Sequence, residues 1–188
     1  MKKIVLFLAA ATISVSAFAQ GGAGAQQNRR AVDWAGFNRY AEADKAVTRA
    51  PLVVFMGDSI TYNWASLRPG FFAEHNYVGR GIGGQTVEHM LARFQADVVD
   101  LHPRAVVILA GINNIAGNNG AIEFENIVGC LKSMCDIARA NNIVPILCSL
   151  TPCHHFFWNQ EAKPAADVIR LNGMLKEYAT RAGVEYLD

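Results

Sequence analysis

The sequence has little excess charge, few cysteines and no long apolar run, and these absences exclude several classes of protein. Its 188 residues carry 17 Lys and Arg against 16 Asp and Glu, so we expect no nucleic-acid partner, because so small an excess cannot neutralise a phosphate backbone. Only 18% of the residues are charged and 52% are hydrophobic, which excludes a disordered chain and predicts a globular core. Four cysteines are too few to build a disulfide scaffold of this length.

The first apolar run is too short to cross a bilayer as a helix and instead predicts export. It covers residues 4–11 and follows Lys2 and Lys3, and residues 17–19 read Ala-Phe-Ala, the small-x-small pattern that signal peptidase cleaves. We predict a signal peptide, a flexible leader and one folded domain, over residues 1–19, 20–30 and 31–188. No cysteine stands at the cleavage point to carry a lipid, so the expected location is secreted or periplasmic, without a membrane anchor.

Short apolar runs alternate with amphipathic segments through the rest of the chain. The runs have the length and continuity of strands buried on both faces of a parallel sheet, and they lie at residues 52–56, 77–80, 104–110, 143–150 and 184–187. Helical spacing of apolar residues predicts helices at residues 33–48, 86–97, 123–141 and 164–181. This alternation predicts an α/β fold, a three-layer α/β/α sandwich around a flavodoxin-like parallel sheet.

The residues that follow each predicted strand indicate the function, because ligands of such sheets bind beyond the carboxyl ends of the strands. These segments are residues 57–59, 81–84, 111–114 and 148–155. They bring a serine hydroxyl, a glycine-rich loop with free N–H groups and a side-chain amide to one edge of the sheet. The alternative for each segment taken singly is a helix cap or a turn.

These groups together suit acyl transfer, which needs a nucleophile and donors aimed at the developing oxyanion. We predict Ser59 as the nucleophile, with its own N–H, the N–H of Gly81 and the side-chain amide of Asn113 as the donors. Asp58 is expected to brace the turn by accepting backbone N–H groups.

Three short motifs resemble the first three blocks of the SGNH, or GDSL, hydrolase superfamily. They are Gly57-Asp58-Ser59-Ile60, Gly81 within Arg80-Gly81-Ile82-Gly83-Gly84, and Gly111-x-Asn113. The resemblance covers roughly residues 33–188 and implies an SGNH fold, ester hydrolysis with Ser59 as nucleophile, and an oxyanion hole completed by Gly81 and Asn113. The third block of the family usually reads Gly-Thr-Asn-Asp, whereas Ile112 and Asn114 stand in it here, so we expect altered loop support.

The fourth block of the superfamily, Asp-x-x-His, does not occur after Gly111. In the family it supplies the general base and the carboxylate that orients it, so we hypothesise that the sequence is a truncated product that lacks both. His154 and His155 follow the fourth predicted strand and are the alternative bases. Otherwise they border the substrate cleft.

Side chains near the predicted edge suggest the kind of ester. Four aromatic side chains could stack on a sugar ring or hold an acyl chain beside His154, namely Trp64, Phe156, Phe157 and Trp158. The alternative is that these rings cover the edge of the core. The predicted export favours a carbohydrate O-acetyl ester as substrate. A lysophospholipid or another acyl ester is the alternative, as is a noncatalytic carbohydrate-binding protein that has lost its base.

We expect no metal and no cofactor. Gly79-x-Gly81-x-x-Gly84 matches the dinucleotide fingerprint literally, but it follows a short second strand instead of opening the first strand-to-helix turn. Asp58 would repel a flavin phosphate in the first loop. The cysteines and histidines of residues 148–155 lack the paired spacing of zinc ligands.

Overall fold

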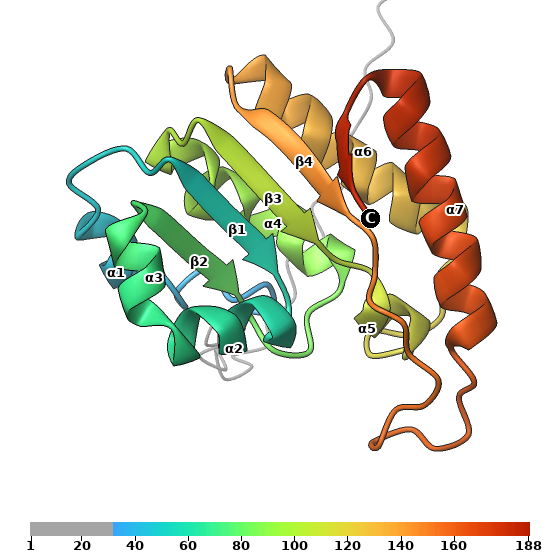
Figure 1. Cartoon of the computed structure of the whole chain (residues 1–188). Coiled ribbons are helices and arrows are strands. Elements are labelled where there is room, and N and C mark those ends of the chain that lie inside the picture. Colours follow the sequence, from blue (N-terminus) through green and yellow to red (C-terminus); the bar gives the residue numbers. More distant parts are fainter. Residues whose placement is uncertain (1–31) are drawn as a thin grey trace, which may run out of the picture. The chain divides into compact units, whose positions relative to one another are not determined.

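Five parallel strands form one sheet in the order β2-β1-β3-β4-β5 (Figure 1). This is the strand order of flavodoxin-like sheets, and it confirms the predicted fold class. The computed structural model describes residues 32–188, of which residues 33–188 form one unit. The predicted signal peptide and leader lie in residues 1–31, outside the described part of the chain.

The strands begin and end close to the predicted positions. They are β1 (Val53–Gly57), β2 (Tyr77–Gly81), β3 (Ala105–Leu109), β4 (Val144–Cys148) and β5 (Glu185–Leu187). The fourth strand is shorter than the predicted segment because the N–H of Leu150 donates to Asn172 Oδ1 at 2.8 Å instead of to a neighbouring strand.

The helices are α1 (Ala41–Lys45), α2 (Ser59–Leu67), α3 (Pro69–Glu74), α4 (Val87–Asp97), α5 (Ile112–Ile115), α6 (Phe124–Ala140) and α7 (Ala165–Ala182), with a 3-10 turn at Val99–Leu101. One face of the sheet packs against α4, α6 and α7, and there alternate strand residues such as Val54, Met56 and Ile108 are fully buried. Burial of these apolar side chains is the main stabilising contribution to the fold. Within residues 32–188, no helix is both long and apolar enough to span a membrane.

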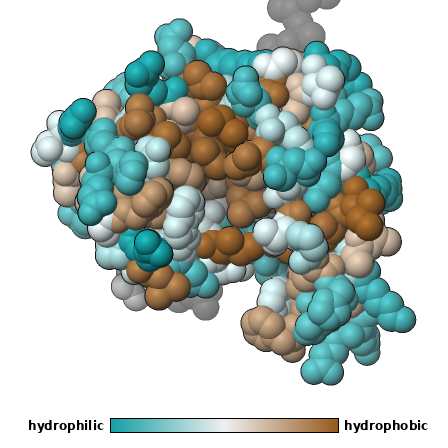
Figure 2. Space-filling view, viewed as in Figure 1, coloured by the Kyte–Doolittle hydropathy of each residue, from teal (hydrophilic) through white to brown (hydrophobic). Residues whose placement is uncertain are grey.

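The opposite face of the sheet is covered only in part. Helices α2 and α3 pack over β1 and β2, where Phe55 and Phe72 meet edge to face at 5.5 Å. Beyond them, Val144 is 52% exposed and Leu187 is 60% exposed on the same face of β4 and β5. Figure 2 shows the apolar surface that gathers over this part of the molecule.

The predicted helix over residues 33–48 is wrong in its first half. The Asp33 carboxylate accepts the N–H groups of Phe37 and Asn38 at 2.7 and 2.8 Å, and Gly36 has a φ of +74°. This turn leads the chain into a loop that buries Ala35 before α1 begins. Helical spacing of apolar residues therefore occurred here without a helix, because a tertiary contact fixes the segment.

Candidate active site

Ser59 is the first residue of α2 and lies directly beyond the carboxyl end of β1. The preceding residue, Asp58, caps the helix by accepting the N–H of Ile60 at 2.9 Å. Ser59 is half-buried, and as the first residue of α2 it contributes one of the first N–H groups of the helix, which have no partner within the helix. A negative charge that develops here is stabilised by the helix dipole.

The glycine loop packs tightly against the first turn of α2. A Cβ on Gly81 would lie 2.2 Å from the nitrogen of Tyr62 and 2.6 Å from the carbonyl oxygen of Asp58, so only glycine fits. A Cβ on Gly83 would lie 3.8 Å from Ser59 Cβ. The backbone of this loop therefore directly borders the predicted nucleophile.

Asn113 is buried in α5 and points its amide toward the same loop. Its Nδ2 donates to the carbonyl oxygen of Gln85 at 2.9 Å, and its Oδ1 accepts from Asn118 Nδ2 at 3.1 Å. The Asn118 amide also donates to the carbonyl oxygen of Gly84 at 3.2 Å. An amide nitrogen carries two hydrogens, and within residues 32–188 Asn113 uses one of them, which leaves the other for a ligand.

The structure thus brings Ser59, the glycine loop and Asn113 to the carboxyl edge of the sheet, as the order of the segments predicts. Asn114, at the position where the family usually has Asp, accepts the N–H of Val87 at 3.1 Å and donates to Glu88 at 2.8 Å. It ties the loop that follows β3 to the start of α4.

Trp64, predicted to bind substrate, packs in an aromatic cluster with Phe55 and Phe72, each at 5.0 Å between ring centroids. This geometry favours the alternative role, in which the ring covers the edge of the core. Half of the Trp158 surface is exposed, and its ring contacts Phe157 at 4.7 Å in the loop between β4 and α7. Trp158 therefore remains available to a ligand.

The two candidate histidines lie on the loop between β4 and α7. His155 Nδ1 and His154 Nε2 are 2.8 Å apart and hydrogen-bond to each other, and His154 lines a cleft of about 270 Å³ together with Leu150 and Asn172. Among residues 32–188, neither imidazole makes a hydrogen bond to Ser59. The prediction that one of them is the base stays untested.

The GDSL-like Lipase/Acylhydrolase family model matches residues 55–188, a span that includes all three motifs. The chain belongs to this family. One similar solved structure is that of BF3764 from Bacteroides fragilis NCTC 9343, described as a candidate acylhydrolase. Its sequence is 40% identical to this chain, and the structures superpose with a TM-score of 0.78 over 81% of this chain and 76% of that chain. A GDSL-like lipase from Bacteroides thetaiotaomicron, BT0569, is 39% identical with a TM-score of 0.77 over 81% and 77%.

A curated relative, the uncharacterized lipoprotein YqeF of Bacillus subtilis (strain 168), is 32% identical over 95 residues. The match covers 46% of this chain and 39% of that protein, so the chain spans well under two thirds of that relative. Family membership confirms the SGNH/GDSL resemblance and makes ester hydrolysis the chemistry of the family to which the chain belongs.

Four residues contribute to this acylhydrolase-family site without having been predicted as site residues, namely Gly83, Gly84, Gln85 and Asn118. Gly83 and Gly84 belong to the same glycine cluster as Gly81, and this position in the sequence indicates that they border the site. Gly84 has a φ of +77°, which favours glycine. No local pattern indicates that Asn118 or Gln85 contacts Asn113, because folding alone brings these segments together.

Proposed function

We propose that Ser59 is the nucleophile of a carboxylic ester hydrolase. The observation that supports this most is the position of Ser59 at the N-terminus of α2, against Gly83, in the same loop system that holds the amide of Asn113. A hydroxyl beside several preorganised donors is the arrangement that acyl transfer requires.

In this mechanism Ser59 Oγ attacks the carbonyl carbon of the ester while a base takes its proton. The carbonyl oxygen becomes an oxyanion, which accepts hydrogen bonds from the Ser59 N–H, from Asn113 Nδ2 and from a backbone N–H of the glycine loop, either Gly81 or the Gly83-Gly84 pair. The intermediate collapses, the alcohol leaves with the proton, and the acyl group stays on Ser59. Water then attacks the acyl-enzyme, releasing the carboxylic acid and restoring the hydroxyl.

The base stays a prediction. One source is an Asp-x-x-His block carried by a longer form of the gene product, and the other is His154 or His155 after movement of their loop. Reading the gene beyond the codon for Asp188 and expressing any longer product tests the first source, because an added block should raise Ser59-dependent turnover. Unchanged turnover in a product that contains the block would contradict it.

We propose a carbohydrate O-acetyl ester as the substrate of an exported enzyme. The export signal predicted in residues 1–19 and the exposed rings of Phe157 and Trp158 support this class, since aromatic faces suit sugar rings. A profile of ester chain lengths tests it. A sugar deacetylase prefers acetate, whereas a lysophospholipase improves with longer acyl chains.

Covalent labelling by a fluorophosphonate tests the nucleophile, with imidazole added as an external base. We expect labelling of the wild type, none of Ser59→Ala, and wild-type labelling of the control Ser66→Ala, which changes an exposed serine on the same helix. A wild type that binds saccharides but is not labelled, and whose binding survives Ser59→Ala, would instead favour the noncatalytic carbohydrate-binding protein.

A further inference from the structure

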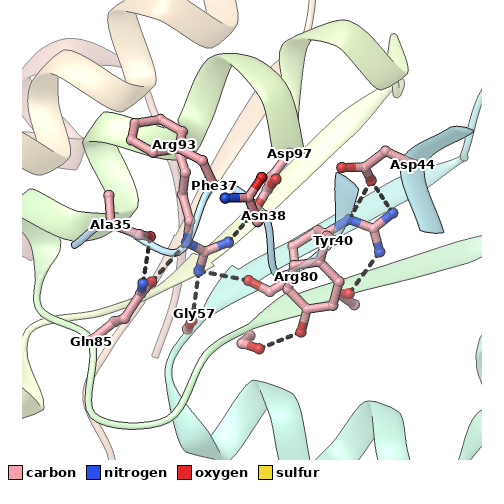
Figure 3. Close-up of polar contacts among 12 residues, drawn as sticks. Ala35, Phe37, Asn38, Tyr40, Asp44, Gly57, Arg80, Gln85, Arg93 and Asp97 are labelled. Carbon is pink, nitrogen blue, oxygen red and sulfur yellow. Dashed lines mark hydrogen bonds and ion pairs between the residues drawn. The ribbon is translucent and has the colours of Figure 1, made fainter. Parts of the chain in front are cut away.

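Arg93 is an arginine without exposed surface that contacts the segments carrying the candidate site residues (Figure 3). Arg93 belongs to α4, and both its side chain and that of its ion-pair partner Asp97 are fully buried. Burying a guanidinium is costly unless its donors are satisfied. A buried charge at this position therefore requires a specific set of acceptors.

Arg93 makes four hydrogen bonds to four different groups. Nη1 donates to Asp97 Oδ2 at 2.5 Å and Nε to Gln85 Oε1 at 2.7 Å. Nη2 donates to the carbonyl oxygens of Arg80 at 2.9 Å and Gly57 at 3.3 Å. Two of these four acceptors are backbone groups that directly precede site residues, since Gly57 stands before Asp58-Ser59 and Arg80 before Gly81.

The bond to Arg80 fixes the direction of the Gly81 N–H. In a planar trans peptide the C=O and the following N–H point in opposite directions, so Arg93 orients that N–H by holding the carbonyl oxygen of Arg80. On the other side of Gly81, the hydroxyl of Tyr40 donates to the Gly81 carbonyl oxygen. Both peptide groups of this glycine are therefore held by side chains from other elements.

Gln85 carries the same restraint to Asn113. Its side chain accepts from Arg93 and donates to the carbonyl oxygen of Ala35 at 2.7 Å, while its backbone oxygen accepts from Asn113 Nδ2. One guanidinium thus connects the segments that carry Ser59, the glycine loop and Asn113. The loop around Ala35 adds a further acceptor for Gln85 and completes the network.

We propose that Arg93 is a positioning residue for the oxyanion hole, which it holds together by binding the Gly57 and Arg80 carbonyl oxygens and Gln85. The proposal rests on the esterase function proposed for Ser59. Tyr40 is its second support, acting on the carbonyl side of Gly81. Lysine cannot replace Arg93, because one ammonium group lacks the planar fork that reaches these acceptors together.

The test measures Ser59-dependent hydrolysis of an activated acetyl ester with imidazole added as base, taking the difference between each protein and its Ser59→Ala counterpart. For Arg93→Lys we expect kcat to fall about 10- to 100-fold with little change in KM, because misplaced donors weaken binding of the transition state but not of the substrate. Arg181 belongs to an exposed ion pair on α7, so Arg181→Lys is the matched control and should keep the wild-type kcat.

Tyr40→Phe is the second variant, in case Arg93→Lys does not fold. It removes one hydrogen bond and keeps the ring, so we expect kcat to fall about 3- to 10-fold, whereas Tyr77→Phe at the far end of β2 should leave it unchanged. If Arg93→Lys folds and keeps the wild-type kcat, the proposal is overturned but the esterase function stands. If Arg93→Lys does not fold, a wild-type kcat in Tyr40→Phe has the same meaning. A wild type with no Ser59-dependent turnover overturns both.

Discussion

At the scale of single residues, the carboxyl group of Asp58 has one oxygen that caps α2 and one without a partner. Oδ1 accepts the N–H of Ile60, whereas Oδ2 is buried with no hydrogen bond within the described residues. Asp58 lines a small cleft with Leu109 and Leu150, and burial in these apolar surroundings raises the pKa of its carboxyl group above the ordinary value, against the smaller opposing effect of the Ile60 N–H. The burial of this carboxyl group beside the predicted nucleophile therefore lowers the stability of the folded protein at pH values where the group is ionised.

Asp58→Asn should raise the free energy of unfolding, by about 1 kcal/mol near pH 7. Between the unfolded pKa of about 4 and the higher folded pKa, the native state binds more protons at Asp58 than the unfolded state does, so its contribution to stability falls as pH rises through this window. Asparagine can still cap the helix but does not titrate. The melting-temperature difference, variant minus wild type, should therefore grow from pH 4 to pH 7.

The exposed carboxylate Asp100 provides the control for this measurement. Asp100→Asn makes the same change at an exposed carboxylate, so it shows how the loss of one negative surface charge alters the melting temperature between pH 4 and pH 7. A melting-temperature difference for Asp58→Asn that does not grow from pH 4 to pH 7 would contradict a raised pKa at Asp58.

At the scale of elements, two glycines have opposite roles because of the backbone around them. Gly111 precedes α5, where it has a φ of +123°, and a Cβ there would lie 3.0 Å from Leu171 Cδ2. Gly129 lies within α6, and a Cβ there would meet nothing within 4 Å. The first glycine allows the turn that presents Asn113, whereas the second only adds conformational entropy to the unfolded chain.

Gly111→Ala should lower the free energy of unfolding by about 1–3 kcal/mol, because alanine is strained at this φ. Gly129→Ala makes the same chemical change in a helix and should raise it by about 0.5–1 kcal/mol. Urea unfolding measures the free energy of unfolding of both variants. Destabilisation by Gly129→Ala would show that a Cβ at this position clashes with neighbouring atoms. Gly111→Ala should also reduce Ser59-dependent turnover, since the turn places Asn113.

At the scale of the whole molecule, the two faces of the sheet differ in how far helices cover them. In the central strands β1, β3 and β4 the residues that face α4, α6 and α7 are buried, whereas half-buried Val107 and Ile146 lie on the other face with exposed Val144 and Leu187. Contiguous exposed apolar surface of this kind is uncommon in monomeric proteins and binds apolar dyes and partners.

The folded protein should therefore enhance the fluorescence of anilinonaphthalene sulfonate under native conditions. The double variant Val144→Lys/Leu187→Lys should lower the signal, because it places two charges on the open face. Ile169→Lys changes an exposed residue on α7 and should leave the signal near that of the wild type. Equal loss in both variants would locate the dye elsewhere.

Local patterns in the sequence are enough to predict the strands, their parallel arrangement and the residues that meet at the carboxyl edge of the sheet. Buried strands are continuous apolar runs and the carboxyl ends of parallel strands share an edge, so local patterns were enough to place Ser59 and Asn113 together. Family membership then confirmed the resemblance carried by the three motifs.

The loop over residues 33–40 and the burial of Arg93 depend on tertiary contacts that no local pattern predicts. Apolar residues at helical spacing predicted a helix where Asp33 and Gly36 instead form a turn that carries Ala35 to Gln85. Arg93 is charged, and nothing local in the sequence marks it as buried. Two of its acceptors, the carbonyl oxygens of Gly57 and Arg80, lie on β1 and β2, so only the folded chain brings them within reach of one guanidinium on α4.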